Sequence, residues 1–335
     1  MEVIPPELRE NISEIVSSPS FDWNVVPDYL RKYVAVFLRY NDILALCDTS
    51  KSVREEICED DFFWEMKTRK DFRAEYDHPP WPRENWEEDY RFYMRKLERD
   101  LINAIKSQNI VKVKELIEFG VDISSKSGFN EYTPLMRALI VGSLELVKLL
   151  LENGAYVNAK TTETRFTALH GEAYEGNSDI VRLLLDYGAD VKAKTSSGEE
   201  AIIFSYKNST SLELVDMLLE KGADINNIGR HGQTLLINAS TSHSGDYIQG
   251  LIDRGAKLNV QSGFGITPLI RAVFSKNPEA VRVLLDNGAD TTIRNGRGNT
   301  VLDIVNGPGY TTPRTKEARD VRRMIREAFG EASRS

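Results

Sequence analysis

The chain has 335 residues, of which 41% are hydrophobic and 28% are charged, a composition typical of globular proteins. Its formal net charge is −8, and most of it lies near the start: residues 1–99 carry 15 Lys and Arg against 22 Asp and Glu, and the remainder carries 28 against 29. DNA, RNA and anionic membranes attract basic surfaces. This acidic balance therefore argues against each of them as the main ligand.

Cysteine usage and the first residues indicate the compartment. Only Cys47 and Cys58 occur, both in a segment predicted to be helical, and with four scattered histidines they form no zinc-binding pattern. Residues 1–6 lack the basic start and apolar run of a signal peptide. The longest apolar stretch, residues 34–38, is far too short to span a bilayer. We expect a soluble protein with reduced thiols in the cytoplasm or nucleus, with no metal and no cofactor.

Residues 1–70 are predicted to form short amphipathic helices separated by polar turns. Residues 4–16 form a first apolar helix, which we expect to brace the following ones. From Val26 the chain continues with Pro27 and an acidic residue, then leucine-rich helices, a Ser/Lys and Arg stretch, and an acidic pair before Trp64. This order resembles an F-box, with valine in place of the common leucine at position 26.

The F-box resemblance covers residues 26–64 and implies a partner. F-box domains dock on the Skp adaptor subunit of cullin–RING ubiquitin ligases, while a separate domain of the same chain holds the substrate. The residues that the resemblance assigns to docking are Pro27, Leu30, Val34, Phe37, Leu38, Ile43, Leu44, Leu46 and Trp64. The alternative is that residues 26–64 are a helical cap that buries the first of the repeats described below.

Residues 71–97 are predicted to be a helical linker. Trp86, Tyr90, Phe92 and Tyr93 recur at helical spacing, and such an aromatic row usually belongs to a core. We expect a rigid helix that joins residues 1–70 to residues 98–330.

Residues 98–330 contain an internal repeat with two markers in phase. Glycines after an apolar run recur at Gly120, Gly154, Gly188, Gly222, Gly255 and Gly288, at intervals of 34, 34, 34, 33 and 33 residues. A threonine that opens a helix recurs at Thr133, Thr167, Thr234, Thr267 and Thr300. This pattern resembles the ankyrin repeat, in about seven copies. The resemblance implies an all-α solenoid of stacked helix pairs, behind a small N-terminal helical F-box-like domain. An F-box followed by ankyrin repeats also resembles the layout of proteins of large double-stranded DNA viruses.

Each marker has a physical role. Threonine caps the first helix, and proline fits its first turn. The second helix carries an apolar stripe, and the glycine after it takes the left-handed conformation that a Cβ opposes. No repeat buries its apolar face alone, so neighbours must stack.

Two repeats depart from the pattern. In the fourth, Glu199-Glu200-Ala201 replaces the Thr-Pro-Leu start, and an extra residue lies in the turn at residues 207–211, so we expect the weakest repeat there. In the seventh, residues 307–313 are inserted between the helices. The last helix, residues 316–329, is rich in Arg and Glu, as expected of a polar terminal cap.

Motifs for catalysis were sought and none was found. The sequence has no G-x-x-x-x-G-K-[ST] phosphate loop and no G-x-S-x-G nucleophile motif. His170 holds the Leu-His position of the ankyrin helix, where we expect it to form hydrogen bonds within the stack. We therefore expect no enzyme.

Ankyrin proteins generally bind partners through hairpin tips and the exposed ends of the first helices. Matching the sequence to the repeat places there Phe129, Tyr132, Ile140, Val141, Phe166, Tyr174, Arg230, His231, Phe264, Ile266, Phe274 and Arg297. Large apolar groups in one register indicate a contact patch, although some of them could instead pack on neighbouring tips. We predict an adaptor that recruits a target protein to a ubiquitin ligase; the alternative is an ankyrin scaffold or inhibitor with no role in ubiquitin transfer.

Overall fold

The computed structural model describes residues 86–118, 121–126, 131–207, 211–307, 310 and 315–330. The F-box resemblance at residues 26–64 with its predicted docking residues, both cysteines and Phe129 lie outside the described residues. The chain divides into two compact parts, an N-terminal part of residues 1–125 and a C-terminal part of residues 126–335, and each is described by itself.

In the N-terminal part, two helices pack against each other: α7 (Trp86–Lys106) and α8 (Ile110–Glu118). Leu101 and Ile105 of α7 and Val113 and Leu116 of α8 are buried. Helix α7 is continuous through residue 97, where the sequence predicted a boundary between linker and repeats.

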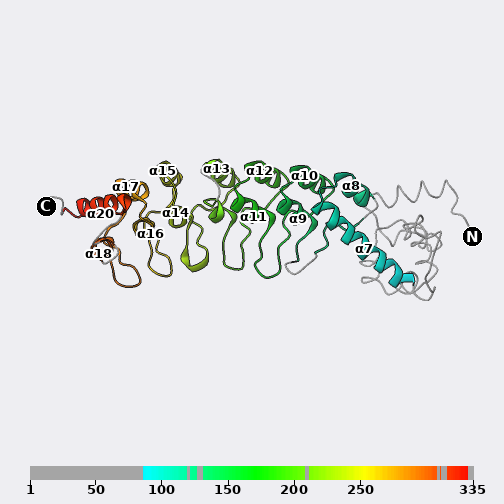
Figure 1. Cartoon of the computed structure of the whole chain (residues 1–335), viewed down its shortest axis with the longest axis horizontal. Coiled ribbons are helices and arrows are strands. Elements are labelled where there is room, and N and C mark those ends of the chain that lie inside the picture. Colours follow the sequence, from blue (N-terminus) through cyan, green and yellow to red (C-terminus); the bar gives the residue numbers. More distant parts are fainter. Residues whose placement is uncertain are drawn as a thin grey trace, which may run out of the picture. The chain divides into compact units, whose positions relative to one another are not determined.

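The C-terminal part is a series of helix pairs (Figure 1). Its helices are α9 (Pro134–Val141), α10 (Leu144–Glu152), α11 (Ala168–Glu175), α12 (Ser178–Asp186), η3 (Ala201–Phe204), α13 (Glu213–Glu220), η4 (Arg230–Gly232), α14 (Leu235–Ala239), α15 (Gly245–Asp253), α16 (Pro268–Ser275), α17 (Pro278–Asp286), α18 (Val301–Asn306) and α20 (Lys316–Ala328). Where the chain is described it contains helices and turns and no β-strand, which confirms the prediction of an all-α fold.

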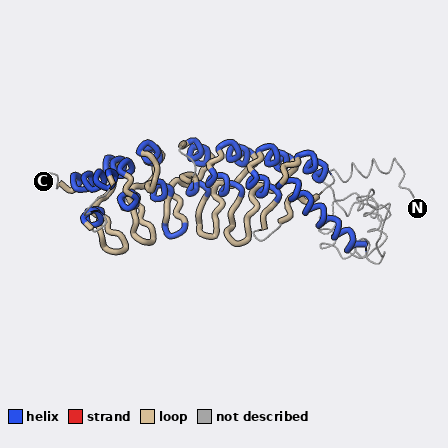
Figure 2. The backbone as a smooth tube through the Cα atoms, in the orientation of Figure 1, coloured by secondary structure: helices blue, strands red, loops and turns tan. Residues whose placement is uncertain are grey.

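The helix pairs form two rows within the C-terminal part. In the first row α9 contacts α11, α11 contacts η3, and the contacts continue through α14 and α16 to α18. The second row contains α10, α12 and α13, and further along the chain α15, α17 and α20. The hairpin loops project from the helices to one side (Figure 2). Side chains on the same position of successive repeats therefore lie in line.

The repeat markers take the roles that the sequence predicted. The Thr133 hydroxyl accepts a hydrogen bond from the Met136 N–H at 3.3 Å, and the Thr267 hydroxyl accepts one from the Ile270 N–H at 3.2 Å. Gly154, after α10, has a φ of +85°, in the left-handed region that favours glycine. Local capping thus fixes these helix ends.

The core is shared between neighbouring repeats. Val181, Leu214, Leu236 and Val281, from four different helices, belong to one continuous buried cluster. The apolar stripe of each helix is covered by the next helix pair, which is the expected source of stability in a stacked array.

At the chain end, Tyr310 from the predicted insertion is buried, and its hydroxyl donates to the Val273 carbonyl oxygen. Helix α20 buries Val321 and Ile325 and exposes Arg323. The final helix thus has an apolar inner face and a charged outer one, as a cap requires.

Asparagines join successive repeats below the helices. Asn158, Asn226 and Asn259 hold the same position, and the side-chain oxygen of each accepts a hydrogen bond from a backbone N–H of the following repeat, at 2.8, 2.8 and 3.0 Å respectively. The Asn158 and Asn226 amides also donate to a backbone carbonyl oxygen of that repeat, each at 3.0 Å. These bonds fix the spacing between neighbouring hairpins.

The fourth repeat lacks this asparagine and replaces it from elsewhere. Lys192 holds the position and cannot accept a hydrogen bond. The backbone N–H of Asp224, which the missing asparagine would bind, instead donates to the buried Glu200 carboxylate at 3.1 Å. The first helix of this repeat is reduced to the single 3-10 turn η3, and Glu200 holds its capping position. The start of the repeat is therefore one residue later than the alignment of Glu199-Glu200-Ala201 with Thr-Pro-Leu predicted. Glu200 therefore compensates for the missing asparagine at position 192, although Glu200 itself replaces the usual capping threonine.

Replacing Glu200 by Ala should lower the free energy of unfolding by about 1–2 kcal/mol, because the Asp224 N–H loses its acceptor. Urea unfolding followed by circular dichroism measures the change. The double variant Lys192→Asn with Glu200→Ala should recover much of the loss, because asparagine restores the acceptor of the other repeats. A double variant as unstable as Glu200→Ala alone would contradict this account.

Candidate binding groove

A groove with a volume of about 870 Å³ lies between α9, α11 and the hairpin that precedes α11, within the C-terminal part. We name it the α9–α11 groove. Its larger apolar and aromatic lining residues are Tyr132, Met136, Leu139, Ile140, Phe166, Tyr174 and Phe204. This volume falls in the range of sites that hold a small molecule or a few side chains of a peptide.

Four residues of the predicted binding face line this groove: Tyr132, Ile140, Phe166 and Tyr174. Tyr132 and Phe166 immediately precede the capping threonines of adjacent repeats, and Ile140 and Tyr174 lie seven residues after those threonines. The common register of the two repeats brings the two pairs together. Val141 is partly buried and is not among the lining residues, and Phe129 lies outside the described residues.

The remaining predicted residues lie further along the stack. Arg230 and His231 are in the turn η4, and Phe264, Ile266 and Arg297 belong to the two following hairpins, whereas Phe274 is near the end of α16. The rings of His231 and Phe264 lie with centroids 5.8 Å apart. None of these six residues lines the α9–α11 groove. The predicted face is therefore spread over two places.

Backbone hydrogen bonds connect successive tips in this second region. The Gly263 N–H donates to the His231 carbonyl oxygen at 2.7 Å, and the Gly296 N–H donates to the Phe264 carbonyl oxygen at 2.8 Å. A Cβ on Gly265 would lie 2.7 Å from the Gly296 nitrogen, so only glycine fits there. The tips are consequently held against one another.

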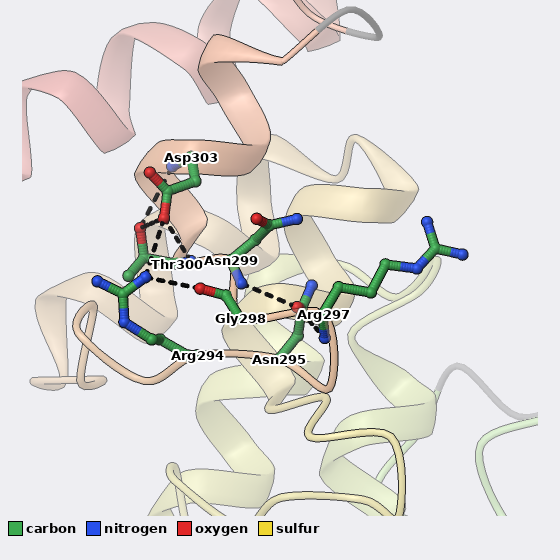
Figure 3. Close-up of polar contacts among 7 residues, drawn as sticks. All are labelled: Arg294, Asn295, Arg297, Gly298, Asn299, Thr300 and Asp303. Carbon is green, nitrogen blue, oxygen red and sulfur yellow. Dashed lines mark hydrogen bonds and ion pairs between the residues drawn. The ribbon is translucent and has the colours of Figure 1, made fainter.

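The last hairpin shows how its own side chains hold a tip (Figure 3). The buried Asn295 side-chain oxygen accepts from the Arg297 and Asn299 N–H groups at 2.9 and 3.1 Å. The Arg294 guanidinium donates to the Gly298 carbonyl oxygen at 2.6 Å. The Arg297 side chain points away from the other labelled residues in Figure 3. It is exposed to solvent.

His170 is buried beside Phe166, which lines the groove. Its Nε2–H donates to the Glu199 carbonyl oxygen at 3.0 Å, which leaves Nδ1 to accept from the Thr167 N–H at 3.2 Å. Burial lowers the pKa of the imidazole. The rings of Phe166 and Phe204 pack with centroids 5.3 Å apart, and Phe166 lies 5.4 Å from the imidazole. As expected from the sequence, His170 forms its hydrogen bonds within the stack.

Glu172 is a groove residue that the sequence analysis missed. Only 5% of its surface is exposed, and burial raises the pKa of its carboxyl group to about 7, with a further contribution from the nearby Glu175. Within the described part of the chain, no hydrogen bond or ion pair involves the Glu172 carboxylate. Comparing the repeats position by position would have found it, because the two adjacent repeats carry Ala138 and Ser205 at the same place.

The other charged groups of the groove are also acidic. Glu163 and Glu175 line it with Glu172, and the described lining residues include no Lys, Arg or His. Two cations lie over aromatic rings that line it: the Arg137 guanidinium carbon is 5.9 Å from the centroid of the Tyr132 ring, and the Lys207 Nζ is 5.6 Å from that of Tyr174. The α9–α11 groove thus combines apolar walls with a buried carboxylate.

The described residues contain no group of three or more His, Cys, Asp or Glu side chains placed to hold a metal ion. None of the described helices combines the length and apolar character needed to cross a membrane.

Replacing Glu172 by Gln should stabilise the protein at about pH 8 by on the order of 2 kcal/mol. The native carboxyl has a pKa of about 7 against an ordinary value of 4.5, so its ionisation destabilises the folded state progressively as the pH rises between these two values. The gain should therefore shrink as the pH falls towards 5. Thermal unfolding across this range measures it, and an equal gain at both ends would contradict the assignment.

Comparisons with known proteins agree with this architecture. Residues 101–195, 159–229 and 202–295 match the family model described as ankyrin repeats (3 copies). The crystal structure of the human ASB11 ankyrin repeat domain matches with a TM-score of 0.56 and 27% sequence identity, over 66% of this chain and 95% of that chain. A search among curated proteins gave no match. Because the family model covers more than half of the chain, this protein belongs to the ankyrin-repeat family.

Proposed function

We propose that this protein captures a target protein in the α9–α11 groove and presents it to a ubiquitin ligase. In this proposal residues 26–64 are an F-box that docks on the Skp adaptor subunit of a cullin–RING ligase. The protein is then an adaptor and not an enzyme, and it acts in the cytoplasm or nucleus, or in those of the host cell if the chain is viral.

The observation that supports target capture is the groove itself. Ankyrin repeats are generally protein-binding units that carry no catalysis of their own. Here Ile140 and Tyr174 are exposed at its edge, and Phe166 is partly exposed. Aromatic side chains in a recess are the groups that most often dominate protein interfaces. A stacked array needs no such recess for its stability, because its apolar stripes are already covered by neighbouring helices.

Support for the ligase role comes from the order of residues between Val26 and Trp64 and from the presence of a separate binding array behind it. In F-box proteins one segment binds the ligase and another segment binds the substrate. If Skp does not bind, the remaining function is that of a scaffold or inhibitor that holds its target without ubiquitin transfer.

Replacing Gly171 by Leu should block target capture. A Cβ at Gly171 would have no atom within 4 Å, and the equivalent positions of the two adjacent repeats carry Arg137 and Phe204, so the fold accommodates a side chain there. Leucine should also raise the thermal unfolding temperature, because glycine inside a helix costs about 1 kcal/mol relative to good helix formers.

The measurement is mass spectrometry of proteins co-purified with the full chain from cell extract. Gly171→Ala is the matched control, since it gains the same helix propensity and leaves most of the groove open. Identical sets of co-purified proteins for Gly171→Leu and Gly171→Ala would place the target site elsewhere.

Replacing Pro27, Leu30 and Leu44 together by polar residues should abolish binding to Skp, because F-box contacts are apolar. Binding of purified Skp to the full chain, measured by calorimetry, tests this. Far-ultraviolet circular dichroism should show that the helices of the repeats persist. No binding of Skp to the unaltered chain would leave the scaffold as the function.

A further inference from the structure

We infer that the α9–α11 groove selects target segments that place a lysine or arginine side chain against the Glu172 carboxylate and an apolar side chain beside Phe166 and Phe204. The inference rests on the proposed capture of a target protein in this groove, and it adds the chemistry of what is captured.

Glu172 lies five residues after the capping residue of its helix. The same position in other repeats holds Ala138, Ser205, Ala239, Ala272 and Val305, all with no exposed surface. These uncharged, small or apolar side chains let successive first helices pack closely. A glutamate serves no such packing role, so the stack itself does not account for it.

Among the described residues, the Glu172 carboxylate has no partner for its charge. Only 5% of the surface of Glu172 is exposed, the residue lines the groove, and the described residues supply neither a hydrogen-bond donor nor a cation to its carboxylate. An ionised carboxylate that is buried without a partner raises the free energy of the folded protein. A cationic side chain of a bound segment would supply the partner, so the stabilisation would contribute to the free energy of binding.

The other charged residues that line the groove with Glu172 are acidic. Along α11 the neighbouring charged residue is Glu175, and on the preceding hairpin Glu163 lines the groove. On α9, Arg137 lies over the Tyr132 ring, and after η3 Lys207 lies over the Tyr174 ring.

The His170 imidazole, on the same helix as Glu172, forms hydrogen bonds with Thr167 and Glu199 through its two nitrogens, and burial keeps its pKa low. The groups that line the groove are therefore negative, and they favour a cationic segment over an acidic one.

The groove offers space beside Gly171 and aromatic rings close to Glu172. Gly171 precedes Glu172 and leaves open the place that Arg137 and Phe204 fill in the adjacent repeats. A long side chain can therefore pass beside α11. A guanidinium suits this position best, because it binds a carboxylate through two hydrogen bonds and also stacks on aromatic faces such as Phe166.

The probe for the test is a random dodecapeptide library displayed on phage and selected on the full chain. Peptides that bind the unaltered protein and are lost with Gly171→Leu define the groove-dependent set. We expect that set to be enriched in arginine or lysine close to an apolar residue. With Glu172→Gln the basic enrichment should disappear while the apolar preference remains, and Glu220→Gln, an exposed glutamate at the end of α13, is the matched control.

A synthetic peptide from that set allows a double-mutant cycle. Replacing its arginine by citrulline, or its lysine by acetyl-lysine, should weaken binding to the unaltered protein by about tenfold or more and have little effect with Glu172→Gln. Binding of the basic peptide should also tighten from about pH 6 to about pH 8 as Glu172 ionises, and this dependence should be lost in the glutamine variant.

The outcomes separate the two proposals. A groove-dependent set with no basic enrichment, or a cycle with no coupling to Glu172, would overturn this inference and leave target capture standing. If no selected peptide depends on Gly171, the groove is not a peptide site and both proposals fail.

Discussion

Each repeat of this protein covers its apolar face only with the next repeat, and the rest of the structure depends on that constraint. Residues as far apart in the sequence as Val181 and Val281 belong to one buried cluster because the helix pairs stack in register. The register has a second effect. It places equivalent side chains in a line along the stack. A change of residue type at one position therefore puts a different side chain in the surroundings that its equivalents share.

Much of the fold could be predicted from the sequence because capping and periodicity are local properties. Threonine at the helix start and glycine at the helix end act within a few residues, and the structure shows both in place at Thr133 and Gly154. Four of the seven larger apolar and aromatic residues that line the groove followed from the same reasoning, since Tyr132 and Phe166 share one position in adjacent repeats and Ile140 and Tyr174 share another. Glu172 was missed because its meaning depends on burial and on the absence of a partner, and neither is visible in a single repeat.

Two glutamates illustrate opposite uses of a departure from the pattern. Glu200 replaces a capping threonine, yet its carboxylate accepts the backbone N–H that Lys192 cannot bind, so the stack remains connected through its shortest helix. Glu172 replaces a small buried residue and gains no such bond. The first departure stabilises the fold, whereas the second destabilises it, and a carboxylate with a raised pKa beside an aromatic groove is a candidate for binding a ligand.

The hydrogen bonds between hairpin tips also limit how this surface can diverge. The Gly263 and Gly296 N–H groups donate to carbonyl oxygens of the preceding tips, and the glycine at position 265 has no room for a side chain. An insertion or deletion in one of these hairpins would leave its neighbour with an unmatched donor. Evolution can therefore exchange the exposed side chains at Phe264 and Arg297 without breaking these bonds, while the length of the hairpins stays fixed. New specificities on this surface would arise by substitution, one position at a time, and not by loop growth.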